Sequence, residues 1–115
     1  MAEVEVAAGI CGFKTRILAR ANGSYTITLH IESDCDHIRQ MAGQVSELSA
    51  LEELMRPICQ TTVYQLAGSC RTHAACPVPS AILKAMEVAA GMALPADVQM
   101  RIRRDGEEHR EPKEE

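Results

Sequence analysis

The fold follows from residues 13–32, which read FKTRILARANGSYTITLHIE. Apolar and polar residues alternate along 13–20 and again along 25–32, the pattern of strands with one buried face. Ala21-Asn22-Gly23 separates the two runs, and Asn-Gly is a strong turn signal of β-hairpins. We therefore expect an antiparallel hairpin in this part of the chain.

The length of the turn sets the register of the hairpin. A two-residue turn would place Ile17 opposite Thr28, whereas a three-residue turn places Ile17 opposite Ile27. The second register keeps the apolar side chains on one face, and the buried face determines the register. We expect the three-residue turn, with Gly23 in the left-handed conformation that glycine adopts readily.

The open end of the hairpin carries two cysteines. In the expected register Cys11 lies opposite Ser33, and Cys35 follows Ser33 closely along the chain. Cys11 also stands between two glycines, so its backbone is free to adopt unusual angles. We therefore expect Cys11 and Cys35 to lie near each other.

The rest of the chain predicts one strand before the hairpin, then helices, then a last strand. Glu and Val alternate at 3–6, and apolar residues alternate with polar ones from Val98 to Arg103. Helical spacing of apolar residues predicts helices within 34–48, 49–58, 63–68 and 79–91. The economical arrangement is an α+β fold. Its small four-stranded, mainly antiparallel sheet has three N-terminal strands and one C-terminal strand, covered on one face by three to four helices.

The length and composition predict one folded unit. The chain has 115 residues, of which 46% are hydrophobic, so it can bury a modest core. We expect a single domain over residues 1–103. Residues 104–115 contain no apolar side chain, and we expect them to form a disordered charged tail.

Charge and hydropathy exclude several kinds of partner. A net charge of -4 and few aromatic residues argue against nucleic acid, which requires a basic surface and stacking side chains. No apolar run approaches the roughly 20 residues that span a membrane. The N-terminus carries acids and lacks the apolar region of a signal peptide. We therefore expect a cytoplasmic protein whose five cysteines are reduced thiols.

Residues 70–80, CRTHAACPVPS, hold the densest group of chemically active side chains. Cys76 directly precedes a predicted helix and Cys35 begins another, and a helix N-terminus lowers the pKa of a nearby thiol. Thiolates are the form that binds soft metals. The candidate ligands are Cys11, Cys35, Cys70 and Cys76, with His73 as a further ligand or as a base. Four thiolates suit zinc or an iron–sulfur cluster.

Other interpretations of these residues stay open. The chain has no Cys-x-x-Cys pair, and free cysteines are often small core residues. Cys59, at the end of a predicted helix, is expected in the core. A thiol redox or sulfur-handling protein would use Cys76 with Cys35 or Cys70 as its partner. An interaction module with structural cysteines is the third possibility.

The cysteine-containing motifs also resemble a protein family. The motifs are Cys11-Gly12-Phe13, Ser33-Asp34-Cys35 and residues 70–79, followed by Lys84-Ala85-x-Glu87-Val88-Ala89-Ala90-Gly91. Together they resemble a small uncharacterised cytosolic family of anaerobic bacteria and archaea, over roughly residues 3 to 103. The resemblance implies a cytosolic protein in a low-oxygen setting, without an assigned activity or cofactor.

These observations together predict a binding function and identify no chemical reaction. We expect a domain that binds a metal ion or an iron–sulfur cluster through clustered cysteines. It would act as an accessory or carrier for another protein. No catalytic motif such as His-Glu-x-x-His or a phosphate-binding glycine loop occurs in the sequence. The oligomeric state does not follow from the sequence.

Overall fold

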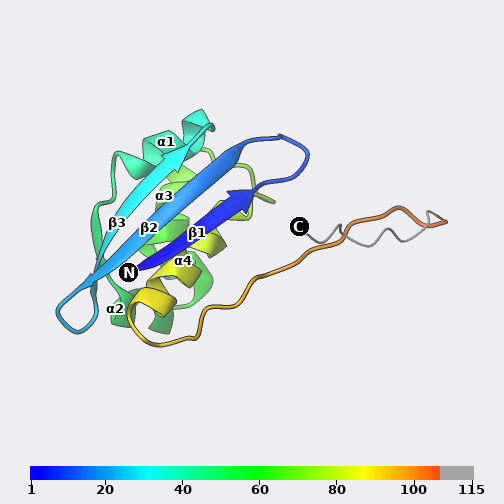
Figure 1. The fold of residues 1–115 in the computed structure, drawn as a ribbon. Coiled ribbons are helices and arrows are strands. Elements are labelled where there is room, and N and C mark those ends of the chain that lie inside the picture. Colours follow the sequence, from blue (N-terminus) through cyan, green and yellow to red (C-terminus); the bar gives the residue numbers. More distant parts are fainter. Residues whose placement is uncertain (107–115) are drawn as a thin grey trace.

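An antiparallel sheet forms the first layer of the protein (Figure 1). The computed structural model describes residues 1–106. Within them the sheet has four strands in the order β1-β2-β3-β4. The strands are β1 (Ala2–Ala7), β2 (Lys14–Asn22), β3 (Thr26–Ser33) and β4 (Glu47–Ser49).

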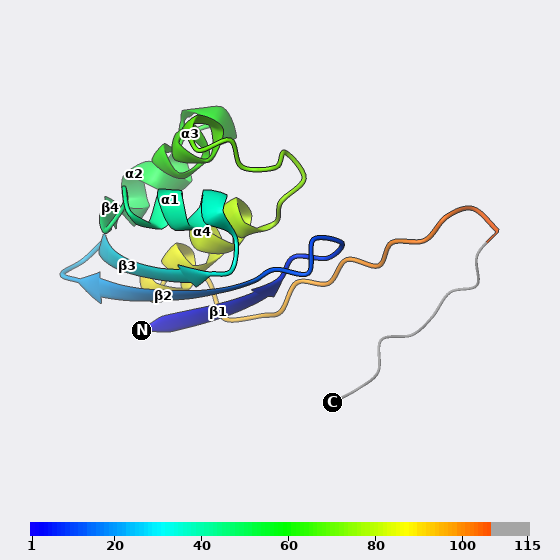
Figure 2. The ribbon, with the colours of Figure 1, turned by 90° about the horizontal axis from the view of Figure 1, so that it is seen from above.

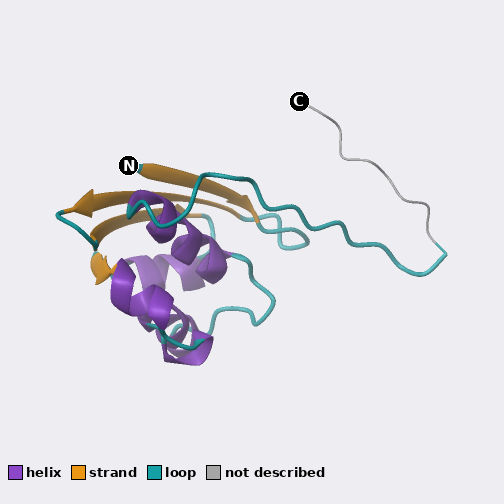
Figure 3. Ribbon diagram, turned by 90° about the horizontal axis from the view of Figure 1, so that it is seen from below, coloured by secondary structure: helices purple, strands orange, loops and turns teal. Residues whose placement is uncertain are grey.

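Helices form the second layer and lie on one face of the sheet, as Figures 2 and 3 show from opposite sides. They are α1 (Asp36–Ala42), α2 (Ala50–Met55), the 3-10 helix η1 (Ile58–Gln60), α3 (Thr62–Ser69) and α4 (Val78–Ala89). The α+β class and the one-sided cover of helices are confirmed. None of the helices in residues 1–106 has the length and apolar character that crossing a bilayer requires. Residues 107–115 of the expected tail lie outside the described residues.

The hairpin has a three-residue turn, but its register differs from the expected one. Ile17 lies opposite Ile31 rather than Ile27, and the turn is formed by residues 23–25 with Gly23 at φ +82°. Thr15, not Cys11, therefore lies opposite Ser33. The partner of Ile17 has moved by an even number of residues, which leaves the same side chains on the buried face, so polarity could not distinguish the two registers.

The fourth strand comes from a different part of the chain than expected. Residues 98–103 have no regular secondary structure, so the predicted C-terminal strand is wrong within the described residues. Instead Leu48 in β4 lies opposite Ile27 in β3. The helical spacing expected to continue to Leu48 ends at Ala42, the last residue of α1. Val45 is still buried, but it reaches the core from the connection between α1 and β4.

The core lies between the inner face of the sheet and the helices. α4 packs across β1 and β2, while α1 packs on β3. Alternate residues of β2 and β3 lie on the inner face of the sheet. They contact helix residues that are three or four positions apart and therefore lie on one side of each helix. The largest fully buried apolar side chains are Ile17, Ile27, Ile38, Met41, Val63, Val78, Ile82 and Met86.

Candidate functional site

Three segments of the chain meet at one end of the sheet. They are the β1–β2 connection, the junction between β3 and α1, and the loop from α3 to α4 (Figures 1 and 2). Cys11 lies in the first of these segments, Cys35 lies in the second, and the third contains Cys70 at its start and Cys76 near its end. All four cysteines are free thiols.

Cys76 lies two residues before the start of α4. Its backbone N–H donates to the carbonyl of His73 at 2.9 Å, which closes a tight turn ahead of the helix. Pro77 stands at the helix N-cap, and its ring restricts the backbone that leads into α4. The thiol is half-buried.

The thiols of Cys35 and Cys11 influence the pKa of Cys76. Burial raises the pKa of the Cys76 thiol, and the negative charges of Cys35 and Cys11 raise that pKa further. A hydrogen bond with the backbone of Val78 lowers the pKa but does not outweigh these effects. The pKa lowering expected from the helix N-terminus is therefore wrong for Cys76, because desolvation dominates.

Cys35 is the N-cap residue of α1. Its backbone is extended, with φ -88° and ψ 125°, and its side chain makes no capping hydrogen bond. The hydroxyl of Ser33 accepts the N–H of Cys35 at 3.1 Å, and the carboxylate of Asp34 accepts the N–H of Lys14 at 3.1 Å. Ser33 and Asp34 thus anchor the end of the hairpin. The Cys35 thiol is half-buried and makes no capping hydrogen bond to the backbone of α1.

A cation lies near Cys35 on the same helix. Arg39 pairs with Asp36, and this pairing raises the pKa of Arg39 and lowers that of Asp36. The charges of Asp34 and Cys35 raise the pKa of Arg39 further. Arg39 was not among the residues identified from the sequence, although its spacing of four residues from Cys35 is the signal for a shared helix face.

Cys11 is exposed in a glycine-rich turn. Gly9 and Gly12 have φ values of +97° and +73°, which side chains rarely tolerate, and the N–H of Gly12 donates to the carbonyl of Gly9 at 2.9 Å. The N–H of Ala8 donates to the carbonyl of Phe13 at 3.2 Å and closes the base of the turn. The turn therefore presents Cys11 to solvent on a backbone that only glycine can form easily.

Cys70 has a different environment from the other three candidates. Its side chain is 3% exposed and belongs to the hydrophobic core. The amide of Gln44 donates to the Cys70 sulfur at 3.4 Å, and a ring nitrogen of His37 lies 2.9 Å from the Cys70 carbonyl. These contacts join the end of α3 to α1 and identify Cys70 as a packing residue in this structure.

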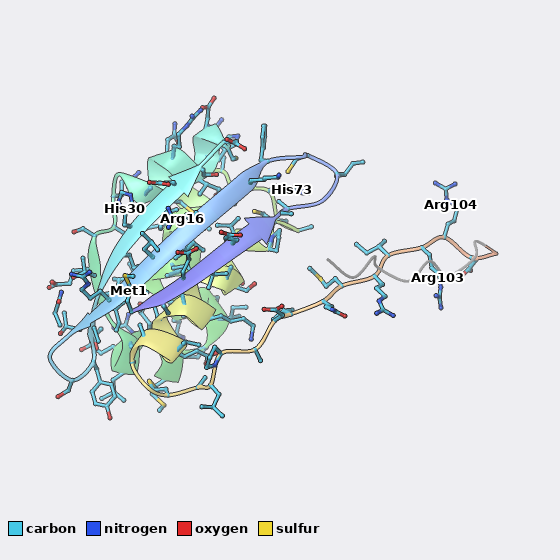
Figure 4. All side chains as sticks on the ribbon, in the orientation of Figure 1. Met1, Arg16, His30, His73, Arg103 and Arg104 are labelled. Atoms are coloured by element: carbon cyan, nitrogen blue, oxygen red, sulfur yellow. The ribbon has the colours of Figure 1, made fainter. Side chains whose placement is uncertain are left out.

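The two remaining residues of interest are both exposed. His73 lies in the α3–α4 loop, and Figure 4 shows it at the same end of the molecule as the β1–β2 connection. Cys59 lies in η1 and is exposed, so its expected place in the core is wrong. α2 ends at Met55, so Cys59 lies in the separate 3-10 helix η1 rather than on the apolar side of the predicted helix.

The three thiols are neighbours without being arranged as a set of metal ligands. Within residues 1–106, no group of three or more His, Cys, Asp or Glu side chains stands close enough together to hold a metal ion. We refer to Cys11, Cys35 and Cys76 as the thiol cluster. Cys35 follows the end of β3, Cys76 precedes α4, and Cys11 lies on a turn rich in glycine.

Comparison with known proteins identifies one family. Residues 2–102 match the model of DUF6951, described as a family of unknown function. The match includes every cysteine of the chain. No curated protein and no solved structure matches the chain.

Proposed function

Because the chain belongs to DUF6951, a family of unknown function, we propose its role from the geometry alone: it binds a soft metal ion or an iron–sulfur cluster through Cys11, Cys35 and Cys76. It acts as an accessory or carrier for a partner protein. The observation that carries the proposal is that the three segments bearing these cysteines meet at one end of the sheet, where the charges of Cys35 and Cys11 act on Cys76.

The charge balance of the thiol cluster supports a cationic ligand. The charges of Cys35 and Cys11 raise the pKa of Cys76, so negative charges on these three thiolates would repel one another. A zinc ion or an iron–sulfur cluster removes that repulsion, because thiolate is the form that binds these metals. Arg39 is the cation nearby, and the charge of Cys35 raises its pKa.

The backbone around the cluster can bring the thiols to bonding distance. Thiolate sulfurs lie about 2.3 Å from zinc in proteins, so the cluster has to close around the ion. Cys11 lies on an exposed turn between Gly9 and Gly12, and an exposed turn has few packing contacts to lose when it moves. Closure of that turn toward Cys35 and Cys76 completes the site.

Three protein thiolates leave one ligand position open. His73 stands in the same loop as Cys76 and is one candidate for that position. A group supplied by a partner protein is the other, and an exchangeable fourth position is the property that a carrier requires. A cytoplasmic location keeps the thiols reduced and available for the metal.

Protein purified without oxygen tests the proposal. Its absorption between roughly 300 and 600 nm, where thiolate-to-iron charge transfer occurs, is measured together with its metal and sulfide content. We expect a bound metal or cluster that is lost in Cys11→Ser, Cys35→Ser and Cys76→Ser. The matched control is Cys59→Ser, which changes an exposed thiol on η1 outside the cluster and retains the metal.

Other outcomes distinguish the remaining functions. Colourless protein with stoichiometric zinc assigns the cluster to zinc rather than to iron. Protein that stays free of metal after anaerobic reconstitution contradicts the proposal. A thiol redox role for the pair Cys35 and Cys76 then predicts rapid alkylation of one of them, whereas uniformly slow alkylation leaves an interaction module with structural cysteines.

A further inference from the structure

The outer edge of β1 is available for pairing. Within residues 1–106, β1 pairs with β2 and forms one edge of the sheet. An edge strand presents a row of backbone N–H and C=O groups that can pair with another strand. β1 reads AEVEVA and contains none of the lysines or prolines that protect many natural edges.

A second segment of the chain has the pattern of a strand without a sheet. Val98, Met100 and Ile102 alternate with Gln99, Arg101 and Arg103, and the three apolar side chains are 61%, 70% and 92% exposed. Alternation of this kind is typical of a strand with one covered face. Large exposed apolar side chains in a row mark a surface that another element covers.

The two faces of this segment match the two faces of β1. On the inner face, Val4 and Val6 are only partly buried at the rim of the core. A strand placed beside β1 would set Val98, Met100 and Ile102 next to these valines. On the outer face, its arginines would lie beside the exposed acids Glu3 and Glu5, and cross-strand pairs of opposite charge stabilise a sheet.

The segment lies beyond the β1 edge of its own copy. The chain leaves α4 near the start of β1 and runs in the direction of β1, past the β1–β2 connection (Figures 1 and 2). The N–H groups of Met92 and Ala93 still donate to the carbonyl of Glu87 at the end of α4, and Pro95 has no N–H to donate to β1. Figure 4 shows Arg103 and Arg104 far outside the sheet.

We propose that residues 98–103 of one copy add as a fifth strand to the β1 edge of a second copy, and that the exchange is reciprocal. The result is a two-fold symmetric dimer in which each copy completes the sheet of the other. Main-chain hydrogen bonds supply affinity, and the alternating apolar and basic side chains supply register. This inference is independent of the thiol cluster.

Light scattering during size-exclusion chromatography measures the oligomeric state of the full chain. We expect the wild type to be a dimer and Met100→Asp to be a monomer, because the substitution places a charge on the covered face. Met55→Asp is the matched control: Met55 and Met100 are both 70% exposed, but Met55 lies in α2, far from the β1 edge in sequence. We expect Met55→Asp to remain a dimer.

Two shortened chains test the same inference without a new charge. A chain ending at Asp97 loses the segment and is expected to be a monomer, whereas a chain ending at Gly106 keeps it and is expected to be a dimer. A monomeric wild type at every concentration overturns the proposal. A dimer that persists in both Met100→Asp and the chain ending at Asp97 also overturns it, because the contact then lies elsewhere. So does a Met55→Asp monomer.

Discussion

Glu53 in α2 accepts a hydrogen bond from the backbone N–H of Val63 in α3, at 3.2 Å. The other carboxylate oxygen accepts the N–H of Thr62 at 2.8 Å and a guanidinium N–H of Arg56 at 3.1 Å. The first N–H groups of a helix have no partners within the helix, and negative charge is favoured at that end. One side chain, only 2% exposed, therefore joins two helices and the connection between them.

Removing the charge of Glu53 should destabilise the fold. We expect Glu53→Gln to lower the free energy of unfolding by about 1–3 kcal/mol, the range for hydrogen bonds to a buried charged group. Urea unfolding measures the change. Glu52→Gln is the control, because Glu52 is 70% exposed and lies 3.6 Å from the same Arg56; its effect should stay below about 0.5 kcal/mol. Equal effects for the two variants would contradict the role assigned to Glu53.

Two glycines should respond to alanine with opposite signs. Gly23 has φ +82° in the hairpin turn, so Gly23→Ala should cost about 1 kcal/mol or more. Gly68 lies in α3 without a positive φ and with open space around it. Gly68→Ala should therefore stabilise the protein by about 0.5–1 kcal/mol, because alanine is the better helix former. Thermal and urea unfolding of the two variants give the signs, and a stabilising Gly23→Ala would contradict the register of the turn.

The stability of the metal-free protein should fall at alkaline pH in a way that depends on Cys76. Burial and the neighbouring thiols raise the pKa of Cys76 in the folded chain. The protonated thiol then contributes stability below the pKa of the unfolded chain, about 8.5. That contribution is lost as the pH rises through the higher folded pKa. We expect Cys76→Ala to lose less stability than the wild type above this pH.

The measurement for Cys76 is the free energy of unfolding as a function of pH, taken in the presence of a chelator and a reductant. Cys59→Ala serves as the control because Cys59 is an exposed residue of η1 outside the cluster. It should keep the pH dependence of the wild type. Identical curves for the wild type and Cys76→Ala would show that the Cys76 thiol is not desolvated in solution.

Cys70 should behave as a core residue. Because it is buried and accepts a hydrogen bond from Gln44, Cys70→Ala should lower the free energy of unfolding by an amount on the order of 1–3 kcal/mol. Any metal bound by the thiol cluster should be retained. Unfolding curves and metal content of the same preparation check both parts. A folded Cys70→Ala protein that has lost its metal would return Cys70 to the set of ligands.

The hairpin shows how much of the structure the local sequence pattern predicts. Alternation along residues 13–32 correctly predicts both strands, the buried face and the length of the turn, but the turn is formed by residues 23–25 instead of 21–23. The register itself was wrong by an even number of residues, which polarity cannot detect. In the structure Tyr25 belongs to the turn because the last pair of the hairpin is Asn22 with Thr26, and the carbonyl of Tyr25 accepts the N–H of Ala50 at 2.8 Å. That contact joins residues far apart in the sequence.

Some features of the candidate site could likewise be predicted from the sequence, and others could not. Cys11, Cys35 and Cys76 could be singled out because each stands at a turn or a helix start, a property of neighbouring residues. The sequence could not show that Cys70 differs from these three cysteines, because the burial of Cys70 depends on Gln44 and on the packing of α3 against α1. The exposure of Cys59 in η1 and the raised pKa of Cys76 both depend on the extent of burial, which the spacing of residues in the sequence does not determine.

The α+β class, the three N-terminal strands and α4 are all readable from the amino-acid pattern, because alternation and helical spacing act over a few residues. The pairing of β4 with β3, the hairpin register and the meeting of three cysteines arise in the folded chain. Each depends on contacts between distant segments, whose free energies include packing and desolvation that a local pattern does not contain. For the same reason, the alternating residues 98–103 have the pattern of a strand but lack a partner strand within the described part of one chain.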